Sequence, residues 1–275
     1  KQLLQKVDQA VWGELLTSFQ DKPGIQAWLR SCACVEAVAW LENAGLKSHN
    51  REFHADLIRH CLRLKLLQEF LPGAGLEQRF TCSCEFACDT SLELAIHAVG
   101  CPKYAQLRTS RHDAVRAQLV KGLQSLHLGA HVTTEAMIAG PIRKRSDVRW
   151  SRGAEVVHFD LSVVSPASAH ALARDSHLQV NIASGLGEEI KRREYDVPLR
   201  NANLLLSALK PVVFETSGRP GAEAGKMSHW FADKARAGGL TSDAGMAFLA
   251  NSAAEIWLHN GRILSAVIRG TPIRA

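Results

Sequence analysis

The chain has 275 residues, with 33 Lys and Arg against 27 Asp and Glu, so its formal net charge is +6. That length fits one or two domains, and 46% hydrophobic with 22% charged residues excludes a globally disordered or collagen-like chain. It has no run of about 18 apolar residues and opens Lys1-Gln2-Leu3-Leu4 without an apolar signal core. We therefore expect a fragment of a longer protein that is neither membrane-spanning nor secreted. Seven cysteines then predict reduced thiols or a metal site rather than disulfides.

The positive charge is concentrated in one segment. Residues 106–153 hold nine bases and three acids, a balance of +6 that equals the net charge of the whole chain. Such a concentration is typical of surfaces that bind phosphate backbones, and a solvated basic face is the alternative. The nine bases are Arg108, Arg111, Arg116, Lys121, Arg143, Lys144, Arg145, Arg149 and Arg152.

Hydrophobic periodicity predicts most of the secondary structure. The first 75 residues are expected to be helical, with clear helices at 3–16 and 57–67, the second ended by Leu71-Pro72-Gly73. A helix over 113–126 is followed by strands at 131–135, 146–150 and 156–164, helical stretches at 167–174 and 186–195, and a buried strand at 210–216. Ala-rich helices follow from residue 222, with a break at Gly238-Gly239 and a weaker break signal at Asn260-Gly261. This order predicts a mixed α/β core flanked by helices.

A cysteine–histidine cluster lies between residues 82 and 101. Cys84, Cys88, His97 and Cys101 follow the pattern C-x3-C-x8-H-x3-C, two close pairs of the kind that a tetrahedral structural zinc needs. Because His97 and Cys101 are four residues apart, one helical turn can present both to one metal. Cys82 leaves a second set open, in which Cys82 and Cys84 form the first pair. Buried free thiols with an incidental histidine are the metal-free alternative, but the clustering of a rare residue favours zinc.

A carboxylate interrupts the apolar strand predicted at 156–164. Alternation places Val157, Phe159, Leu161 and Val163 on one face and Asp160 on the other, with His158 and Ser162. A lone buried acid is costly unless it is paired or bound to metal. If this strand pairs with the preceding one, Asp147 and Asp160 can converge on one divalent cation. The alternative is an aspartate with a structural role that pairs with an arginine.

Lys191 and Tyr195 are four residues apart on a predicted helix and project from one face. A lysine near a metal site can orient a water molecule or stabilise a pentacoordinate phosphate. From these residues alone, an ordinary basic helix surface is the simpler interpretation.

Taken in order, these motifs resemble the C-terminal part of site-specific non-LTR retrotransposon polyproteins. Those proteins carry a CCHC-type zinc knuckle followed by a restriction-like endonuclease, as in the elements that insert into ribosomal RNA genes or trypanosomatid spliced-leader genes. The resemblance covers roughly residues 75–235 and depends on the ordered set rather than on one motif. The set comprises the cysteine–histidine pattern, Arg111-His112-Asp113, Arg145-Ser146-Asp147, Asp160, Lys191-x3-Tyr195 and Phe214-Glu215-Thr216-x-Gly218.

The resemblance implies a PD-(D/E)xK-type core, ordered helix, three strands, helix, strand, with further C-terminal helices in residues 106–275. A helical linker region at 1–75 and the zinc knuckle at 76–105 would precede it. Asp147 and Asp160 would hold Mg²⁺, Lys191 would stabilise developing charge, and Tyr195 would position Lys191 or the phosphate. The usual lysine two residues after the second acid is absent, since Ser162 stands there.

The implied function is Mg²⁺-dependent nicking of double-stranded target DNA in the nucleus, which exposes a 3′ hydroxyl for reverse transcription. The zinc would be structural, retrotransposon RNA would be engaged through the rest of the polyprotein, and no membrane would take part. The alternatives are an inactive nuclease fold that positions the protein on target or template, and a repressor derived from such an element. The expected DNA-binding residues are Arg108, Arg111, Arg116, Arg143, Lys144, Arg145, Arg149 and Arg192.

Overall fold

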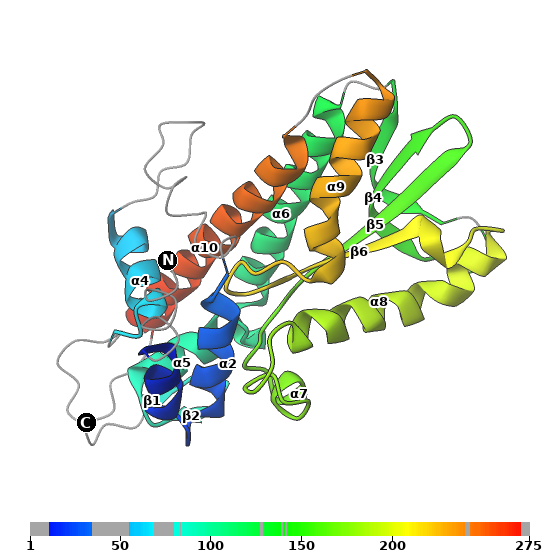
Figure 1. The fold of residues 1–275 in the computed structure, drawn as a ribbon. Coiled ribbons are helices and arrows are strands. Elements are labelled where there is room, and N and C mark those ends of the chain that lie inside the picture. The colour runs from blue at the N-terminus through cyan, green and yellow to red at the C-terminus, as the bar shows by residue number, and fades with distance from the viewer. Residues whose placement is uncertain are drawn as a thin grey trace.

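The protein combines helices with a four-stranded mixed sheet, so the predicted α/β class is confirmed. Our computed structural model describes residues 11–34, 55–68, 80–82, 84–126, 129–138, 140, 142–239 and 243–270. The sheet lies toward one end of the molecule and the N-terminal helices toward the other, with α6 (Ala105–Ser125) and α10 (Ala244–Gly270) running between them (Figure 1). No helix in these ranges is both long and apolar enough to cross a membrane.

The N-terminal region is helical wherever the structure describes it. Residues 11–17 are helical, α2 spans Pro23–Cys32 and α4 spans Ala55–Lys65. Pro23 stands in the first turn of α2, where its fixed φ suits a helix start. The predicted helices at 3–16 and 57–67 are confirmed over their described parts. Residues 1–10 and the predicted stop at Leu71-Pro72-Gly73 lie outside the described residues.

The cysteine-rich segment folds as a small hairpin followed by a helix. Strands β1 (Phe80–Thr81) and β2 (Ala87–Cys88) pair antiparallel, and α5 spans Ser91–Ala98. A capping box starts α5: the Thr90 hydroxyl accepts the Glu93 N–H and the Glu93 carboxylate accepts the Thr90 N–H, both at 3.1 Å, which satisfies two donors at the helix start. A 3₁₀ turn, Pro102–Tyr104, leads into α6.

The sheet has the order β3-β4-β5-β6, with the first three strands antiparallel and β6 parallel to β5. All four strands and the helices between β5 and β6 occur where the sequence predicts them. A parallel neighbour requires a crossover, which here holds α7, α8 and a 3₁₀ turn at Leu206–Ala208. The bounds are β3 His131–Met137, β4 Arg145–Arg152, β5 Glu155–Val164, α7 Ala169–Leu172, α8 Ile182–Asn201, β6 Leu209–Glu215 and α9 Ala222–Ala237.

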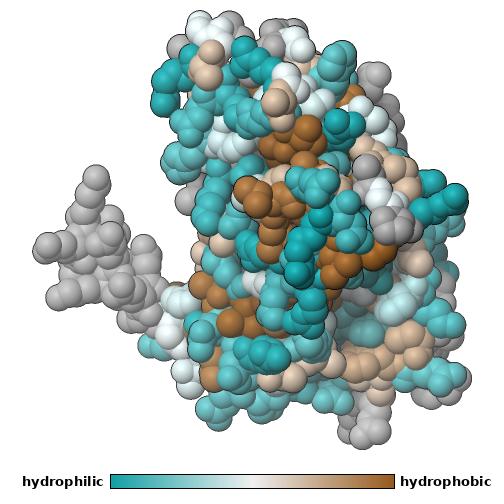
Figure 2. Space-filling view, turned by 90° about the vertical axis from the view of Figure 1, so that its right-hand side faces the viewer, coloured by the Kyte–Doolittle hydropathy of each residue, from teal (hydrophilic) through white to brown (hydrophobic). Residues whose placement is uncertain are grey.

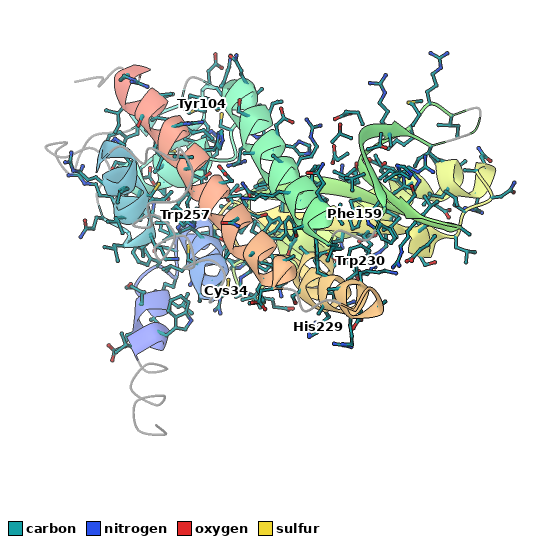
Figure 3. All side chains as sticks on the ribbon, turned by 90° about the horizontal axis from the view of Figure 1, so that it is seen from above. Cys34, Tyr104, Phe159, His229, Trp230 and Trp257 are labelled. Carbon is teal, nitrogen blue, oxygen red and sulfur yellow. The ribbon has the colours of Figure 1, made fainter. Side chains whose placement is uncertain are left out.

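Helices cover both faces of the sheet: α8 lies on one side, and α6 and α9 on the other (Figure 1). The alternation predicted for β5 is confirmed, because Phe159 and Leu161 belong to the hydrophobic core under α6 and α9. Seen from above, Phe159 lies beside Trp230 of α9 (Figure 3), with ring centroids 5.5 Å apart. The smaller core on the other side of the sheet includes Tyr195 of α8.

Helix α10 belongs to two hydrophobic cores. Its first half packs with α6 and α9 through Phe248, and its second half packs with α2, α4 and α5 through Trp257. The rings of Trp257 and Trp28 meet edge to face at 5.8 Å. The break predicted at Gly238-Gly239 is confirmed, since α9 ends at Ala237. The weaker break signal at Asn260-Gly261 is wrong, because the buried Asn260 amide donates to the Thr216 carbonyl at 2.7 Å and stays within α10.

Candidate functional site

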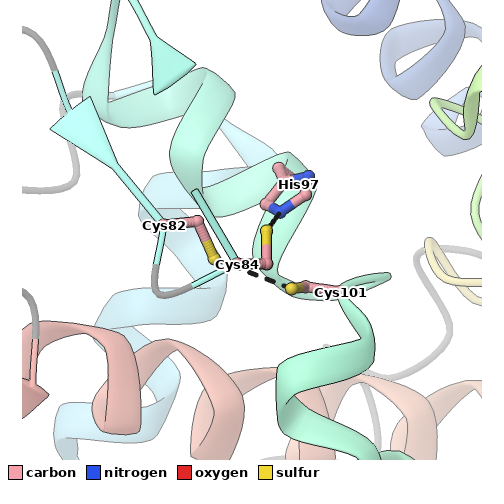
Figure 4. Close-up of side chains that lie close together, drawn as sticks. All are labelled: Cys82, Cys84, His97 and Cys101. Atoms are coloured by element: carbon pink, nitrogen blue, oxygen red, sulfur yellow. Dashed lines mark hydrogen bonds between the residues drawn. The ribbon is translucent and has the colours of Figure 1, made fainter. Parts of the chain in front are cut away.

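Three cysteines and one histidine form a group that can hold a metal ion. The ligand atoms of Cys82, Cys84, His97 and Cys101 all lie within 4.8 Å of one another (Figure 4). Cys82 Sγ is 3.6 Å from Cys101 Sγ, and Cys84 Sγ is 3.1 Å from His97 Nε2. Sulfur ligands about 2.3 Å from a tetrahedral zinc lie about 3.8 Å apart. Small adjustments would therefore bring these four atoms around one such ion.

Cys88 lies outside this group, so the first ligand set predicted from the sequence is wrong and the alternative set with Cys82 is the one brought together. The reason is the register of the hairpin. Cys88 pairs with Phe80, two residues before Cys82, a displacement of about 6–7 Å along a strand. Cys88 is buried in the same hydrophobic core as Cys82 and Cys101, but its thiol is not one of the four clustered ligand atoms.

The surroundings of the cluster suit a metal ligand set. Burial lowers the pKa of His97, which favours the neutral imidazole that binds metals. Burial also raises the pKa of the Cys101 thiol to about 12, so a thiolate there needs a cation to balance its charge. The Phe86 ring stacks on His97, with centroids 4.3 Å apart and planes 7° apart, and fixes the orientation of the imidazole.

A second polar cluster lies where strands β4 and β5 separate. The paired register ends at Val148 and Phe159, and the next position on each strand carries Asp147 and Asp160. Asp160 is 5% exposed. The two acids interact electrostatically, since the charge of Asp147 contributes to raising the pKa of Asp160. The sequence prediction that strand pairing brings these acids near each other agrees with this arrangement.

Helix α8 supplies two groups that contact Asp160. Lys191 Nζ lies 2.6 Å from Asp160 Oδ2, and the Tyr195 hydroxyl donates to Asp160 Oδ1 at 2.6 Å. The same hydroxyl also lies within hydrogen-bonding distance of the backbone carbonyl of Arg145 on β4, so the two acceptors share its single proton. The i,i+4 spacing read from the sequence therefore does place both side chains at one acid.

The two carboxylates experience different environments. Burial raises the pKa of Asp160, although the Lys191 ammonium and the Tyr195 hydroxyl oppose that effect. Burial also acts on Asp147, but its pKa is lowered because hydrogen bonds from His112 and the Leu161 N–H, together with the charge of Lys191, outweigh it. Burial and the negative charge of Asp160 raise the pKa of Tyr195, so its hydroxyl stays protonated as a donor. Pairs of acids whose pKa values are shifted in opposite directions by their surroundings are common at catalytic sites.

His112 is a member of this cluster to which the sequence reading gave no role. It projects from α6, and its Nε2 lies 3.3 Å from Asp147 Oδ2. The hydrogen bond with Asp147 raises the pKa of His112 against the opposing effect of burial. The contact joins residues 35 positions apart, so no local pattern predicts it; the only signal was the place of His112 in the motif Arg111-His112-Asp113.

The predicted DNA-binding bases have different environments in the fold. Arg111 is wrong as a surface contact: it is 1% exposed and donates to the Val99 carbonyl at 2.9 Å and to Asn260 Oδ1 at 2.7 Å. Burial lowers the pKa of its guanidinium to about 9. Its role is to join α6 to α10 and to the end of α5.

Three further predicted DNA-binding bases form ion pairs with acidic side chains. Arg116 pairs with Asp113 and Glu135, Lys144 pairs with Glu194, and Arg192 pairs with Glu223 and Glu188. Arg108 and Arg149 are half-buried. Arg143 and Arg145 are exposed and line a surface hollow with Met137. Within the described ranges, neither of these two has an acidic group at ion-pairing distance, so of the eight predicted DNA-binding residues these two are exposed and open to an anionic ligand.

The face at the sheet end of the molecule is not uniformly charged. Figure 2 shows hydrophobic patches set among hydrophilic side chains on this face. Near the β3–β4 connection, Met137 and Ile142 are 45% and 44% exposed. Any polyanion that binds the exposed arginines would therefore also contact apolar side chains.

No family model matches the chain, and a comparison with curated proteins finds no match. The functional argument therefore depends on the residues and their arrangement.

Proposed function

We propose that this chain is the zinc-knuckle and endonuclease part of a non-LTR retrotransposon protein, and that it nicks double-stranded target DNA in a Mg²⁺-dependent reaction. The observation that carries the proposal is the convergence of Asp147, Asp160 and Lys191 from two strands and a helix onto one place. In the element's life cycle, the nick would prime reverse transcription in the nucleus, with the RNA bound elsewhere in the polyprotein.

The topology supports the PD-(D/E)xK assignment of the core. Helix α6, strands β3 to β5, helix α8 and strand β6 follow the order helix, three strands, helix, strand. The parallel β5–β6 pair places Asp160 beside the strand that returns from α8. This connection brings a lysine from the crossover helix to the acid on β5, which compensates for Ser162 at the usual lysine position.

The donor set fits a hard divalent cation. Asp147 and Asp160 would supply the oxygen ligands that Mg²⁺ prefers, and among the described residues no soft ligand such as a thiol forms a hydrogen bond or ion pair with them. When bound, the ion lowers the pKa of a coordinated water and polarises the scissile phosphate.

The residues of the chain would divide the remaining work. Lys191 carries a positive charge at the carboxylates, where it would stabilise negative charge that develops on the phosphate. Tyr195 holds Asp160 through its hydroxyl. Arg143 and Arg145 would bind the DNA backbone, an interaction that weakens with salt because neutralised phosphates release counterions.

The cysteine–histidine group would hold zinc in a structural role. Its four protein ligands leave no open position, as is typical of structural rather than catalytic zinc. Cys82 and Cys101 are part of the core that α2, α4, α5 and α10 share. The ion would therefore stabilise the packing of the hairpin and α5 against those helices.

One observation favours the second candidate, an inactive nuclease fold that only positions the protein on nucleic acid. Asp160 already has both oxygens in contact with protein groups, Lys191 and Tyr195. A carboxylate neutralised in this way is stable without a metal ion.

Nicking of supercoiled plasmid DNA tests the proposal. With Mg²⁺ or Mn²⁺ the protein should convert supercoiled to open-circular DNA, and Asp160→Asn should slow the reaction by about three orders of magnitude, equivalent to about 4 kcal/mol. Asp160→Asn should still bind DNA, whereas Arg143→Ala with Arg145→Ala should weaken binding and flatten its salt dependence.

Asp196→Asn is the matched control, because Asp196 also lies on α8 but pairs with Arg200 away from this cluster. It should nick at the unmodified rate. Protein that binds DNA with the expected salt dependence yet never nicks it would overturn the enzyme proposal and favour the binding module.

A further inference from the structure

Asp147 has no pairing partner in the sheet, although it lies within β4. Its neighbours Val148 and Ser146 pair with Thr134 and Ala136 on β3, but Asp147 has no partner in the register with β3 or in the register with β5. The residue opposite it on β3 is Glu135, which has φ +51°, a conformation that interrupts pairing as in a β-bulge. Because Asp147 itself has no partner in either register, the position of its carboxylate depends on the donors that reach its oxygens.

Two donors reach the Asp147 carboxylate, and both reach the same oxygen. The Leu161 N–H donates to Oδ2 at 2.5 Å, and His112 Nε2 lies 3.3 Å from Oδ2. Within the described ranges, no hydrogen bond to Oδ1 is formed. The contacts therefore fix the carboxylate by one oxygen and leave the other available.

His112 is itself held by a chain of charged groups. His112 Nδ1 lies 3.4 Å from Asp113 Oδ1, and Asp113 Oδ1 lies 3.1 Å from an Arg116 guanidinium nitrogen. Arg116 then pairs with Glu135, the residue opposite Asp147. This series of contacts thus links Asp147 on β4, one turn of α6 and Glu135 on β3. Helix α6 therefore contacts both strands at the position where Asp147 and Glu135 do not pair.

We propose that His112 is a positioning residue of the nuclease site, which holds Asp147 by Oδ2 so that Oδ1 is presented to the metal ion. This inference deepens the proposed function and depends on it. Outer partners of metal-binding carboxylates and imidazoles are a recognised determinant of metal affinity, and their loss lowers affinity or activity by about 10–100-fold.

Three variants of His112 separate the effect of the hydrogen-bond donor at the place of Nε2 from the effect of side-chain volume. The amide nitrogen of glutamine can replace imidazole Nε2, whereas that of asparagine reaches only the place of Nδ1. His112→Gln should therefore keep Mn²⁺ affinity and nicking within about threefold of the unmodified protein. His112→Asn and His112→Ala should weaken both by about 10–100-fold.

Mn²⁺ binding to the zinc-loaded protein without DNA, measured by isothermal titration calorimetry, gives a readout that is independent of activity. Asp160→Asn defines the signal that comes from this site, and His229→Asn, an exposed histidine on α9, is the matched control. Thermal unfolding of each variant separates loss of the contact from loss of the fold. Raising Mg²⁺ should partly rescue nicking by His112→Asn, which a purely structural defect would not allow.

The outcomes distinguish this inference from the proposed function. Unchanged Mn²⁺ affinity and nicking in folded His112→Asn and His112→Ala, beside a strong loss in Asp160→Asn, would refute the role of His112 and leave the nuclease intact. An unmodified protein that neither binds Mn²⁺ at Asp160 nor nicks DNA would refute both.

Discussion

Serine substitution of Cys82 and of Cys88 separates the two zinc ligand sets. Both cysteines are buried, at 4% and 3% exposure, so the two substitutions perturb packing to a similar degree. The ligand atoms place Cys82 in the metal group and Cys88 outside it. We expect about one zinc per chain in the unmodified protein and in Cys88→Ser, and little zinc in Cys82→Ser at the same free zinc concentration.

The stability change follows from linkage. Zinc at 1,000 times its dissociation constant stabilises the folded state by about 4 kcal/mol. At about 2–4 °C per kcal/mol for a chain of this size, chelation or Cys82→Ser should lower the Tm by about 8–16 °C. The loss should be global rather than local, because Cys82 and Cys101 lie in the same core as Trp28 and Trp257.

Zinc content is measured by inductively coupled plasma mass spectrometry, and Tm by circular dichroism. Both are measured with and without chelator. Zinc retained by Cys82→Ser but lost by Cys88→Ser would show that the hairpin register is not the one described. A fully folded protein that contains no metal, and whose Tm is insensitive to chelator, would refute the zinc site itself.

Two further predictions concern packing and pH. Gly187→Ala should lower both Tm and nicking, because the new Cβ would lie 2.9 Å from Val213 Cγ1 and push α8, with its lysine, away from the sheet. Gly185→Ala on the same helix meets nothing within 4 Å and should stabilise by up to about 1 kcal/mol; equal effects of the two substitutions would contradict this packing. Burial lowers the pKa of His259 to about 4, so between that value and the unfolded value of about 6.5 the unfolded state binds the additional proton. Stability should therefore fall by about 2 kcal/mol from pH 7 to pH 5 through this residue, as measured by urea unfolding. His259→Leu should lose correspondingly less, exposed His229→Leu should behave as the unmodified protein, and an unchanged loss in His259→Leu would refute the assignment.

The elements of the sheet were predictable because their signals are local. Alternation around Phe159 and Asp160 in β5 depends only on the two-residue period of a strand. In the structure Phe159 lies in the core with α6 and α9, whereas Asp160 contacts α8 on the other face. Lys191 and Tyr195, four residues apart, likewise lie on one face of α8, where both contact Asp160. In contrast, the choice between Cys82 and Cys88 depended on how two short strands pair, which neither spacing nor composition determines.

Burial of charge was the other feature that composition could not predict. Arg111 was counted with the basic segment, yet it is buried. A helical signal for this was present, because Arg111, Val115 and Leu119 follow one another at four-residue intervals and Val115 and Leu119 are core residues. His112, the next residue, points to Asp147 instead, a partner that only the tertiary structure reveals.

The contact between Trp28 and Trp257 joins residues 229 positions apart. At about 5–20 residues per second, roughly 10–45 s separate the synthesis of these two side chains on the ribosome. During that interval the apolar surfaces of α2, α4 and α5 lack the helix that covers them. Early zinc binding by the hairpin would order part of this region before α10 emerges, so zinc supply during translation, and not only afterwards, should affect how much of the protein folds correctly.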